Sequence, residues 1–221
     1  MQVFDEKNLL WQNSKTCKHL AASIQDLLGT NTVKKVLCFG LGDFCRSAPE
    51  WLKRQYDSWD EISEVKNVMG SMIQHSMALT IAQLCGGNKP LPLFTQDPGY
   101  TEVAEEILTK REFKIIGTHG AGGFAEIDEE SIIISPFAAA PVKQIIADLA
   151  RPVLIISTGF AVFNDNEKPL ADAESPRTRQ MWLDYETYSL PSHSDDVEIC
   201  SALRGLHVYC RRQQSLDLQG A

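Results

Sequence analysis

The sequence of 221 residues has no apolar run as long as the roughly 18 residues that a membrane-spanning helix needs. Its start carries Asp5, Glu6 and Lys7, where a signal peptide would need a basic segment and then an apolar one. Positive charge is scarce, because 21 Lys and Arg face 29 Asp and Glu for a net charge of −8. Nucleic acids and anionic membranes attract basic surfaces, so we expect neither partner, and we expect a cytoplasmic or nuclear protein.

The sequence also lacks the usual signatures of metal and serine chemistry. Its six cysteines show no C-x-x-C spacing, and its five histidines are scattered with no ligand pair at helical spacing. The nucleophile motif Gly-x-Ser-x-Gly is absent. We therefore predict no metal site, and whether the protein is an enzyme stays open.

The most informative stretch that is present runs from residue 36 to 44, where an apolar run ends in Gly40-Leu41-Gly42 and is followed by Asp43. Such a run is typical of a strand buried on both faces of a parallel sheet. Glycines at the turn let a ligand approach bare backbone. The third glycine of a dinucleotide fingerprint is missing, because Cys45 holds its place. A tight strand-to-loop turn in an α/β core therefore explains the stretch as well as a ligand site does.

Apolar runs alternate with helical patterns along most of the chain. This alternation predicts an α/β fold, a Rossmann-like, doubly wound and mostly parallel sheet with helices on both faces. Strands are expected at 36–41, 91–95, 113–118, 132–135, 152–157 and 206–210, and helices at 5–28, 58–86, 102–111 and 141–150. Gly70 is a candidate break in the second helix, and residues 160–196 show only loop-like patterns.

We divide the chain into an N-terminal helical extension at 1–32 and a single α/β domain at 33–212. A helical insertion is expected within that domain at about 45–69. The tail at 213–221 is expected to be disordered.

Polar residues gather where the predicted strands end. Asp97 follows the strand at 91–95, at the sheet edge where doubly wound folds keep the acid that binds ribose hydroxyls. An equal alternative is that Asp97 or Thr101 caps the next helix. His75 lies on the helix at 58–86, where it either lines the site or is a half-buried histidine with one hydrogen bond. The candidate binding residues are Gly40, Gly42, Asp43, Gln74, His75, Gln96, Asp97 and Gly122.

Three motifs occur in one order: Phe39-Gly40-Leu41-Gly42-Asp43-Phe44, Ser71-x-x-Gln74-His75, and Gln96-Asp97-Pro98-x-Tyr100-Thr101. In residues 33 to 160 the chain resembles the sensitivity-to-red-light-reduced family. The resemblance implies a regulator: of clock genes and light signalling in plants, of heme biosynthesis and clock genes in animals, and of microtubule-related stress in yeast. It implies no settled catalytic activity. Relatives tend to carry Pro-His-Cys where this chain reads Ser135-Pro136-Phe137-Ala138-Ala139-Ala140.

Three functions follow as hypotheses. The first is a regulatory protein that binds a small, nucleoside-like ligand. The second is a methyltransferase-like enzyme using S-adenosylmethionine, although Gly42 and Asp97 are 55 residues apart where about 20 is usual. An inserted helix at 47–60 accounts for part of that excess. The third is a protein-interaction scaffold whose aromatic stretch at 51–59 contacts a protein partner.

Overall fold

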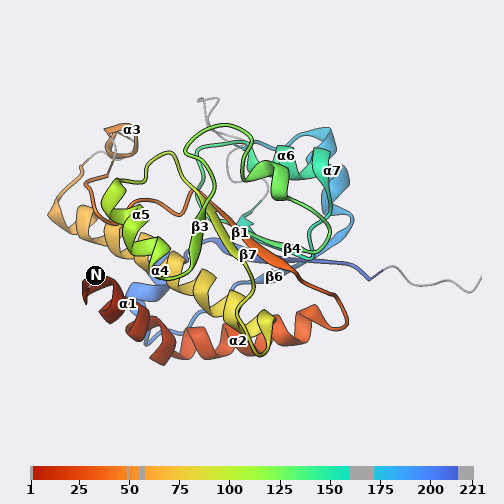
Figure 1. The fold of residues 1–221 in the computed structure, drawn as a ribbon, viewed down its shortest axis with the longest axis horizontal. Helices are drawn as coiled ribbons and strands as arrows, with labels where there is room; N and C mark the ends of the chain where they lie inside the picture. Colours follow the sequence, from red (N-terminus) through yellow and green to blue (C-terminus); the bar gives the residue numbers. More distant parts are fainter. Residues whose placement is uncertain (1, 49, 55–57, 160–171, 214–221) are drawn as a thin grey trace, which may run out of the picture.

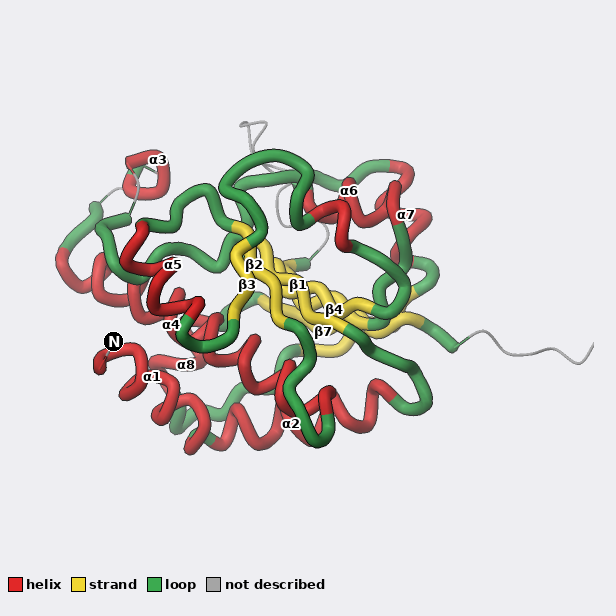
Figure 2. The backbone as a smooth tube through the Cα atoms, in the orientation of Figure 1, coloured by secondary structure: helices red, strands yellow, loops and turns green. Residues whose placement is uncertain are grey.

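The computed structural model contains one seven-stranded sheet in the order β3-β2-β1-β4-β5-β7-β6 (Figures 1 and 2). It describes residues 2–48, 50–54, 58–159 and 172–213. The strands are β1 (Lys35–Phe39), β2 (Leu93–Gln96), β3 (Phe113–Ile115), β4 (Ser131–Ser135), β5 (Leu154–Thr158), β6 (Tyr185–Ser189) and β7 (Leu206–Arg211). The pairs from β3 to β5 are parallel, whereas β7 runs antiparallel to both its neighbours. The predicted Rossmann-like, mostly parallel sheet is confirmed.

Helices cover both faces of this sheet (Figure 2). They are α1 (Gln2–Asn13), α2 (Lys15–Leu28), α3 (Glu50–Lys53), α4 (Glu61–Gly86), α5 (Glu102–Thr109), α6 (Val142–Leu149), α7 (Pro176–Trp182) and α8 (Val197–Ala202). Residues of α1, α2, α4, α5 and α8 pack on one face, and residues of α6 and α7 on the other. Because both faces are covered, β4 and β5 are buried along their whole length, as the apolar runs predict.

The helix predicted at 5–28 is two helices. Ser14 separates them, and its hydroxyl accepts a hydrogen bond from the Cys17 backbone N–H as the N-cap of α2. Phe4 and Trp11 of α1 are fully buried in the same core as the sheet, and the Trp11 indole donates to Thr80 of α4 at 2.9 Å. The division of the chain into 1–32 and 33–212 stays a prediction, with the first segment packed on α4.

Gly70 does not break the second long helix, because α4 runs without interruption from Glu61 to Gly86. One internal glycine costs a helix only about 1 kcal/mol, and the burial of the residues around it outweighs that cost. The helix begins later than predicted, because Asp60 is its N-cap and accepts from the Ser63 N–H at 2.8 Å. The predicted insertion at about 45–69 thus contains α3 and the first turns of α4.

The segment 160–196, which shows only loop-like sequence patterns, contains regular structure. The edge strand β6 and helix α7 lie there, and α8 begins at its end. The sequence of β6 shows no apolar strand pattern, because four of its five side chains are exposed. Residues 160–171 and the tail after Gln213 lie outside the described residues. None of the helices within the described ranges is long and apolar enough to cross a membrane.

Candidate functional site

The carboxyl ends of β1 and β2 meet at one edge of the sheet, and their loops bond to each other there. The backbone N–H of Gly42, after β1, donates to Oδ2 of Asp97, after β2, at 2.7 Å. Oδ1 of Asp97 accepts from the Gly99 N–H, also at 2.7 Å. The central strand ends at Phe39 and not at residue 41, because Gly40 and Gly42 have φ values of +65° and +83°.

Asp43, in the loop after β1, makes the reciprocal contact to the loop after β2. Its Oδ2 accepts from the Thr101 N–H in the loop after β2, and its Oδ1 accepts from the Cys45 N–H, each at 2.5 Å. We call Asp43, Asp97 and the backbone groups they hold the carboxylate cross-brace. Thr101 is the N-cap of α5 through its side chain, so Asp97 does not cap that helix.

His75 of α4 lies beneath the cross-brace and is fully buried. Its Nδ1 lies 2.8 Å from the Ser71 carbonyl, and its Nε2 lies 2.8 Å from the Tyr100 hydroxyl. A carbonyl can only accept, so Nδ1 carries a proton, and in the neutral ring Nε2 accepts from the Tyr100 hydroxyl. The Tyr100 oxygen then accepts from the Thr95 hydroxyl at 2.7 Å. Because the ring is fully buried, its charged form is disfavoured, and this arrangement is that of a neutral imidazole.

The surroundings of His75 agree with that protonation state. The rings of Phe44 and Phe113 lie 5.3 and 5.5 Å from its ring centre, edge to face. Burial lowers the pKa of His75 to about 4 and raises the pKa of Tyr100 well above its ordinary value. The Ser71 hydroxyl donates to the Gly42 carbonyl at 2.5 Å, which joins this hydrogen-bonded chain to the glycine turn. His75 is a core residue that supports the edge.

Gln96 holds the glycine-rich loop after β3. Its Oε1 accepts from the Gly123 N–H at 2.8 Å, and its Nε2 donates to the Gly120 carbonyl at 3.1 Å. A Cβ on Gly123 would lie 2.6 Å from that Oε1 and 2.8 Å from the Phe39 ring, so a larger residue at 123 would displace these side chains. The predicted residue Gly122 is exposed, and a Cβ there would lie 3.1 Å from the Ile116 side chain.

Two of the predicted residues have other neighbours. A Cβ on Gly40 would lie 2.6 Å from the backbone of Ala138, within the segment after β4 that departs from the family pattern. Gly40 therefore allows a close approach between two loops of the chain itself. The Gln74 side chain donates to the Ala202 carbonyl of α8 at 3.2 Å, so it is not hydrogen-bonded into the cross-brace.

Exposure divides the eight predicted residues by role. Gly40, Gly42 and Asp97 are partly exposed, and Gly122 is exposed, whereas Asp43, Gln74, His75 and Gln96 are buried. Burial raises the pKa of Asp97, although two backbone donors and the nearby Arg46 guanidinium act against that shift. A molecule at this edge can therefore reach the two glycines and one carboxylate, which the buried side chains hold in place.

Sequence reasoning missed a second buried acid at the start of α6. Asp172 accepts from the backbone N–H groups of Lys143 and Gln144 at 2.5 and 3.3 Å. Lys143 is itself buried, and its Nζ lies 3.4 Å from the Gly159 carbonyl after β5. Burial raises the pKa of Asp172 and lowers the pKa of Lys143. Nothing in the sequence marks these residues, because they are 29 positions apart and outside any motif.

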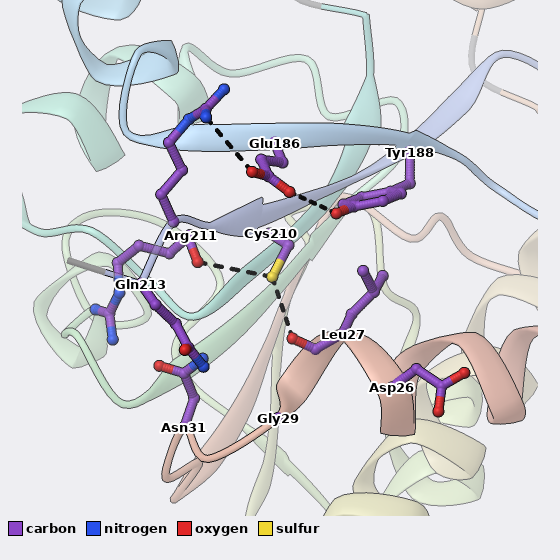
Figure 3. Close-up of a pocket in the computed structure, with 10 residues that line it drawn as sticks. Asp26, Leu27, Gly29, Asn31, Glu186, Tyr188, Cys210, Arg211 and Gln213 are labelled. Atoms are coloured by element: carbon purple, nitrogen blue, oxygen red, sulfur yellow. Dashed lines mark hydrogen bonds and ion pairs between the residues drawn. The ribbon is translucent and has the colours of Figure 1, made fainter. Parts of the chain in front are cut away.

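A cavity of about 520 Å³ lies elsewhere, between the end of α2 and strands β6 and β7 (Figure 3). Leu27, Glu186, Tyr188 and Cys210 are among its lining residues. The eight predicted site residues do not line it. Across the described ranges, no three His, Cys, Asp or Glu side chains are grouped as a metal ion would require.

Comparison with protein-family models matches residues 17–210 to the SRR1 domain. The match extends beyond both ends of the motif-bearing segment 33–160, into α2 on one side and to β7 on the other. Comparison with curated proteins finds no match.

Proposed function

The chain belongs to the SRR1 domain family, and we propose that it is a regulatory protein that binds a small, nucleoside-like ligand at the carboxyl edge of β1 and β2. A setting in circadian or light signalling or in the control of heme biosynthesis, and a cytoplasmic or nuclear location, are part of this proposal. The regulatory setting comes from the family resemblance, and the location is the expectation stated from the sequence. The proposal of a ligand rests on the geometry at the carboxyl edge of β1 and β2.

One observation carries the ligand proposal: the partly exposed Asp97 carboxylate is hydrogen-bonded to the turn at Gly42. In an open α/β sheet, ligands bind outside the carboxyl ends of the strands, and an acid there accepts ribose hydroxyls. A carboxylate has about four acceptor positions, and the Gly42 and Gly99 N–H groups use two of those on Asp97. Two positions remain for a pair of neighbouring hydroxyls.

The buried side chains support this role by fixing the acid before a ligand arrives. Asp43 ties the β1 loop to Thr101, and the His75–Tyr100 pair ties α4 to the loop after β2. A site held in this way loses little conformational entropy on binding. Arg46, beside Gly99 and Asp97, adds one positive charge that suits a ligand with a single anionic group.

A methyltransferase-like enzyme is the second candidate, and the strand order favours it. From β3 to β5 the order matches the 3-2-1-4-5 order of the doubly wound folds that bind nucleotide cofactors outside the carboxyl ends of their strands. Gly42 and Asp97 are 55 positions apart, and the segment between them includes α3 and the long helix α4, which account for the unusual spacing. One fold supports many functions, so the order by itself does not establish a reaction.

The scaffold hypothesis rests on the aromatic stretch at 51–59. The side chains of Trp51 and Tyr56 lie outside the described residues. The Trp59 indole donates to the Glu64 carboxylate of α4 at 2.8 Å, which is a contact within the fold. The scaffold hypothesis replaces the ligand proposal if the protein binds none of the compounds tested below.

Calorimetry with adenosine, S-adenosylmethionine and related compounds tests the proposal. We expect binding to the wild type and a loss of about 5- to 150-fold in Asp97→Ala, because two ligand hydroxyls lose their acceptor. Asp97 also holds two backbone N–H groups, so circular dichroism must show that the variant is folded at the temperature used. Asp128→Ala is the matched control, since Asp128 accepts from the Glu130 N–H just before β4, at the other end of the sheet.

The outcomes separate the three hypotheses. Binding without turnover supports a regulatory ligand site, and transfer of the methyl group from S-adenosylmethionine to an acceptor supports the enzyme. If no compound binds the wild type below millimolar concentration, the ligand proposal fails and the scaffold replaces it. Equal affinities of the wild type and Asp97→Ala would remove Asp97 from the site.

A further inference from the structure

The outer strand β6 has an open edge in the described structure. It ends the strand order, and Glu186, Thr187, Tyr188 and Ser189 are exposed. Proteins commonly protect such edges with Lys, Pro or a bulge. The five residues of β6 include one charged side chain, Glu186, and neither Lys nor Pro, and they pair with β7 in unbroken register.

The pairing with β7 shows which backbone groups point outward. Arg212 N–H donates to the Asp184 carbonyl at 2.8 Å, and Leu190 N–H donates to the Leu206 carbonyl at 3.3 Å. In an antiparallel pair, residues alternate between facing the partner strand and facing away. By this alternation Glu186 and Tyr188 bond to β7, and the N–H and C=O groups of Tyr185, Thr187 and Ser189 point to the open side.

We propose that β6 pairs with β6 of a second copy of this chain, antiparallel about a two-fold axis at Thr187. Thr187 then faces Thr187 of the second copy, and Tyr185 faces Ser189 in both directions. All three pairs use outward-pointing backbone groups, so each exchanges two hydrogen bonds. The two sheets become one continuous sheet.

The side chains complement each other in this register. Glu186 lies opposite Tyr188 of the second copy in a non-hydrogen-bonded pair, where Cα atoms are about 4.5 Å apart. Within one chain the Tyr188 hydroxyl already donates to the Glu186 carboxylate at 2.6 Å (Figure 3). The same bond can form between copies. Arg212, 3.4 Å from Glu186, offsets the charge of the two carboxylates.

Neighbouring registers are worse. A shift toward the start of β6 places Glu186 directly opposite Glu186 of the second copy, and like charges in that position are destabilising. A shift toward its end places Pro191 opposite Tyr185, and proline has no N–H for the ladder. Of these three registers, only the one centred on Thr187 satisfies both the backbone and the charges. Its Tyr185–Ser189 and Glu186–Tyr188 pairs are self-complementary, as a two-fold contact between copies of one chain requires.

Sedimentation velocity with the full chain over a dilution series tests the proposal. We expect a monomer–dimer equilibrium for the wild type. Thr187→Pro should be monomeric, because it removes an outward N–H and leaves the bonds to β7 intact. Tyr188→Phe should weaken the dimer about 2- to 30-fold through the loss of two cross-strand pairs. Thr187→Ser is the matched control and should dimerise like the wild type.

Two charged variants test the same contact if the proline variant does not fold. Thr187→Lys and Thr187→Glu each place like charges across the axis and should weaken the dimer by roughly tenfold. Mixing the two variants should restore it, because Lys then faces Glu. The proposal is overturned by a wild type that stays monomeric at its highest soluble concentration. A Thr187→Pro dimer as tight as the wild type overturns it as well, as does a mixture that stays monomeric.

Discussion

The carboxyl edge of β1 and β2 and the outer margin of β6 and β7 use carboxylates in opposite ways. At the first, Asp43 is 7% exposed and bonds only to backbone N–H groups of two loops. At the second, Asp184 and Glu186 have half-exposed side chains and pair with Arg151 and Arg212. A buried acid that satisfies backbone donors is part of the fold, whereas an exposed ion pair contributes little to stability. The polar residues of the margin are therefore available for contacts with another molecule.

The largest test of this contrast is Asp43→Ala. It leaves the N–H groups of Cys45 and Thr101 without the carboxylate that accepts from both of them. We expect the free energy of unfolding to fall by about 2–6 kcal/mol, at roughly 1–3 kcal/mol for each unsatisfied group. Urea denaturation measures this loss. A loss below about 1 kcal/mol would contradict the structural role of the cross-brace.

The second test uses pH. His75 has a pKa of about 4 in the folded chain against an ordinary 6.5. Between these values the unfolded chain binds the proton and the folded chain does not, so acid favours unfolding. The stability that neutral His75 provides is complete above pH 6.5 and is lost as the pH falls toward 4. The shift corresponds to about 3 kcal/mol.

Denaturation of wild type and His75→Gln at several pH values isolates this effect from other groups that titrate in the same range. The variant should be less stable at neutral pH, because the contacts of a buried ring are lost. The difference between the two proteins should shrink as the pH falls through that window. A constant difference from pH 7 to 4 would show that burial does not lower the pKa of His75 in this way.

The smallest effect is expected at the margin. Asp184→Ala removes the side-chain pair with Arg151, whose two side chains are 49% and 31% exposed. The backbone carbonyl of residue 184 still accepts from Arg212 N–H. We expect a change of less than about 1 kcal/mol in the free energy of unfolding. A loss as large as that of Asp43→Ala would remove the difference between the two regions.

The fold class followed from local patterns. Apolar runs such as those of β4 and β5 are typical of strands buried on both faces, and helical patterns between them favour parallel crossovers. Strand β6 was missed because an edge strand with four exposed side chains has no apolar pattern to detect. Two helix predictions were wrong in opposite ways. At Ser14 a cap divides the predicted helix into α1 and α2, whereas at Gly70 the packing keeps α4 continuous.

The sequence placed Gly42, Asp43 and Asp97 at one edge, because the ends of neighbouring parallel strands must meet there. It could not show that the two acids exchange bonds between their loops, or that His75 is buried and neutral. Those facts depend on which backbone donors the folded loops bring within 3 Å and on how much water the packing excludes. Local patterns carry the periods of strands and helices, whereas hydrogen-bond partners 25 to 58 residues apart arise only when the sheet is assembled.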